Sequence, residues 1–167
     1  MLTNLVLLYR QALAHNRYSL SRGFVPAHLV MRKCGSCTEC CTHIGIAETN
    51  SPPGVPCKHI CSKGCAIYAD RPQACADVKC LWLNGEFSVN DRPDKSKMVC
   101  WVTMSGLMKR DGEKTPTVYA SHKGKPRKKI LRRLIAASYA TPIVLIPGRG
   151  NDPKTRKIYW QGKKLDG

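Results

Sequence analysis

The sequence has few aromatic residues and no long apolar run. Aromatic residues make up 7% of the 167 residues, with only two Phe, so we expect a small, mainly aliphatic core. Apolar runs stay well below the roughly 20 residues that cross a bilayer, and we therefore expect no membrane partner. The first ten residues carry no basic leader and no small-residue cleavage site, which predicts an intracellular, cytoplasmic protein.

Acidic residues are also scarce, and catalytic motifs are missing. The 11 Asp and Glu are scattered, so no carboxylate pair indicates acid–base chemistry, and no Ser/His/Asp arrangement can be argued. Gly148 and Gly150 are not followed by Gly-Lys-Ser/Thr, which excludes a phosphate-binding loop of that type. The sequence therefore leaves open whether the protein is an enzyme.

What the chain does contain is cysteine, with nine of its ten cysteines between Cys34 and Cys80. The densest run is Cys34-Gly-Ser-Cys37-Thr-Glu-Cys40-Cys41. Gaps of two residues let two sulfurs reach one ion from a tight turn, which glycine eases. Adjacent residues rarely direct both side chains at one ion, so Cys40 and Cys41 are expected to serve two sites or to bridge two metals. Eight or more ligands predict two zinc ions or an iron–sulfur cluster.

Other uses of these cysteines remain open from the sequence. A bacterial ferredoxin pattern requires a fourth cysteine where this chain has Ile44, although a cluster with a remote fourth ligand is still possible. Ten cysteines can also form five disulfides, an arrangement typical of secreted proteins. A redox dithiol enzyme needs one reactive pair rather than a cluster. His43 and His59 lie beside cysteines and are further candidate ligands, although such histidines more often support a ligand than bind metal.

The order of the cysteines carries a resemblance. The first run is followed by Gly64-Cys65-Ala-Ile-Tyr68, Arg71-Pro72 and Leu81-Trp82-Leu83. Over residues 34–100 the chain resembles the CxxCxxCC (YkgJ-type) cysteine-cluster family of zinc- or iron-chelating domains. The resemblance implies metal binding but no particular reaction. It implies the ligands Cys34, Cys37, Cys40, Cys41, Cys57, Cys65, Cys75 and Cys80, with Cys61 and Cys100 as additional candidates.

The predicted fold is a small α+β protein in three stretches. Residues 1–33 contain an amphipathic helix over 2–14, residues 34–104 form the cysteine-cluster region, and residues 105–167 form a basic region packed on the same domain. The β-rich segments 98–104 and 117–121 predict strands. Residues 51–56 predict a loop and residues 90–94 a turn.

The last stretch is expected to hold a basic helix and a terminal hairpin. Pro126 is suited to the first turn of a helix that continues to about Tyr139. Its apolar face would consist of Ile130, Leu131, Leu134 and Ile135. Residues 143–146 and 156–160 predict the two strands of the hairpin.

Positive charge dominates the chain and is concentrated in this last stretch. The net charge is +17, and residues 101–167 hold 16 basic but only four acidic residues. This imbalance predicts an acidic protein surface or nucleic acid as the partner. The expected contact residues are Lys125, Arg127, Lys128, Lys129, Arg132 and Arg133. The alternative is a helix that docks by its apolar face and leaves its charges in solvent.

The sequence thus favours a protein whose metal is mainly structural and whose basic surface meets an acidic partner. One alternative is an iron–sulfur enzyme or redox component. Another is a nucleic-acid-binding module or a structural subunit of a larger assembly, such as a virus particle, which would place the protein in the virion.

Overall fold

The computed structural model describes residues 32–110, 113–148 and 153–165. The protein is α+β, as the sequence predicts. The expected amphipathic helix over 2–14 lies outside the described residues. Among those described, no helix has the length and apolar character needed to span a bilayer.

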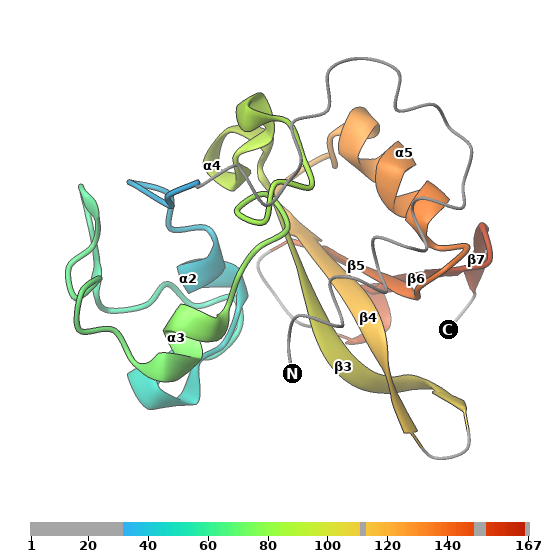
Figure 1. The fold of residues 1–167 in the computed structure, drawn as a ribbon, viewed down its shortest axis with the longest axis horizontal. Coiled ribbons are helices and arrows are strands. Elements are labelled where there is room, and N and C mark those ends of the chain that lie inside the picture. Colours follow the sequence, from blue (N-terminus) through green and yellow to red (C-terminus); the bar gives the residue numbers. More distant parts are fainter. Residues whose placement is uncertain (1–31, 111–112, 149–152, 166–167) are drawn as a thin grey trace.

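The larger part of the fold is a five-stranded sheet with the order β3-β4-β5-β6-β7 (Figure 1). Its strands are β3 (Met98–Arg110), β4 (Glu113–His122), β5 (Ile143–Pro147), β6 (Lys157–Trp160) and β7 (Lys163–Leu165). β4 and β5 are parallel, and the other neighbours are antiparallel. The strands predicted over 98–104 and 117–121 and the 143–160 hairpin are confirmed, and β7 adds an edge strand that was not predicted.

The helix α5 (Lys128–Ala137) connects the parallel strands β4 and β5 and packs on one face of the sheet (Figure 1). Ile130, Leu134 and Ala137 are buried there against a core that includes Val118 and Ile143. The predicted apolar face is therefore confirmed. The predicted start is wrong, because Arg127 is the N-cap and Pro126 precedes the helix.

Short elements joined by loops form the cysteine region, which lies beside the sheet (Figure 1). In chain order they are α2 (Cys40–His43), η2 (Ala47–Thr49), β1 (Ile60–Cys61), β2 (Gly64–Cys65), α3 (Gln73–Asp77), η3 (Val89–Asp91) and α4 (Pro93–Ser96). A further one-turn helix, η4 (Pro153–Thr155), precedes β6. The predicted turn over 90–94 is thus the junction of two helical turns, and residue 104, the predicted boundary of the region, falls within β3.

The cysteine region is joined to both faces of the sheet through contacts with β3 and β4. The Leu81 N–H donates to the Cys100 carbonyl at 2.7 Å, and Leu81 is buried with the α5 side of the core. On β4, Ser121 alternates with the core residue Ala120 and so belongs to the opposite face, where its Oγ lies 2.7 Å from His43 Nδ1. The region is therefore held in place without a large apolar core of its own.

Candidate metal centre

All ten cysteines are free thiols in the structure, so none is committed to a disulfide. Side chains are not fully gathered around a common point, however. Within the described ranges, no three Cys, His, Asp or Glu side chains stand close enough to hold a metal ion as they are placed. The description below therefore concerns which cysteines the fold makes neighbours.

The first cysteine pair lies on a tight turn. The Cys37 N–H donates to the Cys34 carbonyl at 3.1 Å, and Gly35 takes a φ of +56°, which glycine adopts at low cost. The hairpin β1–β2 packs on this turn through Gly64, whose φ is +120°. A Cβ at Gly64 would lie 2.6 Å from the Gly35 carbonyl oxygen. Both glycines are thus required for the hairpin and the turn to approach so closely.

The adjacent pair Cys40 and Cys41 begins α2, where their sulfur atoms lie 3.9 Å apart. Two sulfurs that each lie about 2.3 Å from one tetrahedral ion are about 3.8 Å apart. The Cys40 and Cys41 sulfurs therefore have the spacing of two thiolates that bind one ion or belong to one binuclear centre. Their hydrogen bond raises the pKa of Cys40 far above the usual thiol range. The same bond lowers the pKa of Cys41 to about 7, against the opposing effect of burial. The two thiols therefore share one hydrogen bond, which favours ionisation of Cys41 over ionisation of Cys40.

Cys40 belongs to one set of four cysteines. Besides the Cys41 hydrogen bond and burial, the charges of Cys34 and Cys80 raise the pKa of Cys40. Burial raises the pKa of Cys80 to about 11, with further contributions from Cys34 and Cys37. Such mutual effects require these thiols to be near one another. We refer to this set as the inner group, because Cys80 is part of the core and Cys40 packs against it. The inner group consists of Cys34, Cys37, Cys40 and Cys80.

Cys41 belongs to a second set of four, which we refer to as the outer group. The segment after α2 folds back so that the Cys57 N–H donates to the Cys41 carbonyl at 3.0 Å. Burial raises the pKa of Cys75, and the charges of Cys41, Cys57 and Cys65 raise it further. A small cavity of about 40 Å³ is lined by Cys41, Cys57 and Cys75, and Cys40 reaches it from the inner group. The outer group consists of Cys41, Cys57, Cys65 and Cys75.

Backbone N–H groups point at two sulfurs of the inner group. Burial raises the pKa of Cys37, and N–H groups of Glu39 and Asp94 that donate to its sulfur oppose that rise. The N–H groups of Leu83 and Trp82 likewise donate to the Cys80 sulfur and oppose the rise in its pKa. A donor aimed at sulfur stabilises the thiolate, which is the form that binds metal. These donors offset part of the effect of burial, but the pKa of both thiols stays above the usual value, so a bound cation would be needed to hold them as thiolates.

A cation lies close to the outer group. The Arg71 guanidinium stacks over the Tyr68 ring at 3.9 Å and donates to the Tyr68 carbonyl at 3.0 Å. Its charge contributes to the lowered pKa of Cys41. Pro72 is the N-cap of α3, and its carbonyl accepts from the Cys75 N–H at 3.0 Å. The Tyr68, Arg71 and Pro72 motif thus shapes the turn that presents Cys75.

The other sequence-predicted ligands lie outside the two groups. Cys61 is exposed on the β1–β2 hairpin. Cys100 is buried in β3, where burial raises its pKa strongly and Cys80 adds to the effect. Both ring nitrogens of His43 are used, Nδ1 with Ser121 and Nε2 with Glu39 Oε2 at 3.2 Å. In this arrangement His43 is not available as a ligand.

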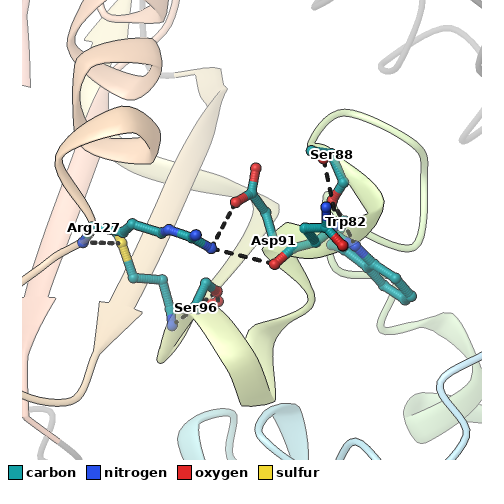
Figure 2. Close-up of polar contacts among 7 residues, drawn as sticks. Trp82, Ser88, Asp91, Ser96 and Arg127 are labelled. Carbon is teal, nitrogen blue, oxygen red and sulfur yellow. Dashed lines mark hydrogen bonds and ion pairs between the residues drawn. The ribbon is translucent and has the colours of Figure 1, made fainter.

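The basic residues of α5 are all exposed, but two of them have partners within the chain. Arg127 Nη1 lies 2.8 Å from Asp91 Oδ1 and also donates to the Asn90 carbonyl (Figure 2). The Asp91 side chain is only 4% exposed. Arg133 lies over the Phe87 ring at 5.4 Å. Lys125, Lys128, Lys129 and Arg132 are thus the better candidates for an external contact.

Arg127→Ala is expected to lower the free energy of unfolding by about 1–3 kcal/mol, because it leaves the buried Asp91 carboxylate without its charged partner. Chemical denaturation of the purified protein measures this loss. Arg132→Ala removes the same charge from an exposed site and should stay within about 0.5 kcal/mol of the parent protein. Equal stability of the two variants would show that the Asp91 pair contributes nothing.

Comparisons with known proteins assign no family to the chain. No protein-family model, curated protein or solved structure matches it. The resemblance to the CxxCxxCC family therefore remains a prediction from the order of the cysteines.

Proposed function

We propose that the protein binds metal through eight cysteines, which form two sets of four thiolates and hold two zinc ions or an iron–sulfur cluster. The inner group would form one site and the outer group the other. The observation that carries the proposal is the proximity of the cysteines, because the Cys40 and Cys41 sulfurs lie 3.9 Å apart and both residues line one small cavity with Cys57 and Cys75. Four thiolates per site is the donor set of closed zinc sites and of iron–sulfur clusters.

The donor chemistry of the chain fits such a centre. The cysteines form no disulfide in the structure, backbone N–H groups face Cys37 and Cys80, and Arg71 lies near the outer group. A bound metal would neutralise the repulsion between four thiolates that otherwise resist ionisation together. It would also order the loops of residues 34–97, whose short elements share little apolar surface. The role that follows is mainly structural.

The metal content of the full chain, purified without oxygen, tests the proposal. Elemental analysis and an absorbance spectrum are taken on the same sample. A colourless protein with about two zinc per chain supports closed structural sites. A brown protein with stoichiometric iron and a broad band near roughly 400 nm supports an iron–sulfur centre and the redox alternative. A fully folded protein free of both metals would contradict metal binding.

The same proposal gives the basic helix an acidic partner, either a protein surface or nucleic acid. Its support is the exposure of Lys125, Lys128, Lys129 and Arg132 on and beside α5, away from the buried Ile130 and Leu134. Binding through such a surface weakens steeply with salt. Replacing the four exposed residues by Gln while keeping Arg127 should remove the binding without changing the metal content.

A further inference from the structure

A second cavity, of about 210 Å³, lies between the cysteine region and the sheet. His43 and Pro53 line it from the cysteine region, and Trp101, Tyr119 and Ser121 line it from β3 and β4. Tyr119 alternates along β4 with Val118 and Ala120, which face α5, so the cavity opens on the opposite face of the sheet. It adjoins the small cavity lined by the outer group at Ile44, which lines both.

One wall of this cavity is aromatic. Trp101 and Tyr119 are partners across β3 and β4, with ring centroids 5.7 Å apart and planes inclined by 25°. Both side chains are half-buried, so part of each ring surface remains accessible. Paired rings on a sheet face offer a platform on which a planar ring stacks, as bases do in single-strand binding proteins.

The floor of the cavity is polar and already organised. Ser121 Oγ lies 2.7 Å from His43 Nδ1 and donates to the Gly148 carbonyl at 3.1 Å. The other ring nitrogen of His43 faces Glu39. Since these groups bind one another, they fix the shape of the floor.

One side chain that lines the cavity is cationic. Arg156 lines it, and none of the described lining residues is acidic. A guanidinium presents paired N–H donors that match a phosphate. Thr103, exposed on β3, adds a hydroxyl at the rim. The net charge of +17 would draw anionic ligands toward the molecule as a whole.

From these features we propose that the cavity binds one nucleotide unit, with its base stacked on Trp101 and Tyr119 and its phosphate paired with Arg156. The cavity is smaller than the roughly 300–1,000 Å³ of sites for drug-sized ligands, which suits a single ring system. Free mononucleotides and single-stranded nucleic acid share this chemistry. The site is distinct from the basic helix, which lies on the other face of the sheet.

Calorimetric titration of the full-length, metal-loaded protein tests the proposal. The probes are adenosine 5′-monophosphate, a twelve-residue deoxythymidine oligonucleotide and inorganic phosphate. Arg156→Gln should weaken binding by about tenfold or more, since it removes a charged hydrogen bond. The control Arg132→Gln, on α5, should change the affinity for the mononucleotide by less than about twofold. Tyr119→Leu should weaken it by about tenfold and provides a second test if Arg156→Gln does not fold.

The three probes separate the two sources of the ligand. Binding of the mononucleotide shows a site for free nucleotides, whereas binding of the oligonucleotide alone shows a site for single strands. In either case, the binding is assigned to the cavity only if Tyr119→Leu or Arg156→Gln weakens it. The proposal is overturned if neither nucleotide probe binds, if inorganic phosphate binds as well as they do, or if Arg132→Gln weakens mononucleotide binding as much as the cavity variants do. Metal content is measured on the same samples, so that a loss of nucleotide binding can be told apart from a loss of metal.

Discussion

Cys75→Ser is expected to remove about one metal equivalent and to lower the free energy of unfolding by several kcal/mol, because metal binding and folding are coupled in small thiolate sites. Cys75 is half-buried, and its sulfur faces the outer group rather than the core. Serine preserves the size of the side chain while replacing the thiolate, so the loss would report on ligation. Elemental analysis and urea unfolding of the same preparation measure both effects.

The two-group arrangement makes this prediction more specific. Cys34→Ser, in the inner group, should remove the other metal equivalent, and the double variant should remove both. Cys61→Ser is the matched control, because Cys61 is exposed and lies in neither group. Its metal content and stability should equal those of the parent protein. If Cys75→Ser retains all its metal and unfolds at the same urea concentration, the outer group is not a metal site.

The sequence predicted the regular part of the fold well, for a local reason. Ile130 and Leu134 recur at helical spacing, and the segments 98–104 and 143–146 are rich in β-branched residues, so each element is specified by its own side chains. The limits of α5 were less accurate because Pro126 fits the residue before a helix as well as its first turn. β7 was missed because Lys163–Leu165 is short and contains two lysines.

The division of the cysteines was predicted only in outline. The adjacency of Cys40 and Cys41 led to the prediction of two sites or a bridge between two metals, and the structure places the two sulfurs 3.9 Å apart. The fold decides which cysteines are neighbours. It does so through the backbone hydrogen bond from Cys57 to Cys41 and through the packing of Cys80 at the β3 edge, and such long-range contacts leave no local pattern in the sequence.

Contacts between distant segments were missed for the same reason. The strand register places Trp101 opposite Tyr119, where it lines the larger cavity, and no local pattern in the sequence indicates this position. Arg127 was predicted to contact a partner, and the structure shows that it also pairs with Asp91, 36 residues away. Residue type shows what a side chain can do, but its partner is decided by the folded chain.

Gly64→Ala is expected to be among the most destabilising changes outside the cysteines, at about 3 kcal/mol or more. Two costs combine there. A φ of +120° is rarely adopted by L-residues, and the new Cβ would meet the Gly35 carbonyl oxygen at 2.6 Å, in the turn that carries Cys34 and Cys37. Because that contact is with backbone, no side-chain rotation relieves it. The hairpin must move away from the turn, and we expect the inner group to lose metal as it does.

Gly124→Ala separates the two costs. Gly124 has a φ of +70° but no atom within 4 Å of a Cβ at that position, so its substitution introduces backbone strain without a clash. Its expected cost is about 1–2 kcal/mol, with the full metal content retained. Urea unfolding and metal analysis of both variants provide the comparison. If Gly64→Ala were no more damaging than Gly124→Ala, the close packing of the hairpin on the Cys34–Cys37 turn would not support the centre. A larger loss of stability that is accompanied by metal release would instead show that this packing holds the inner cysteines in place.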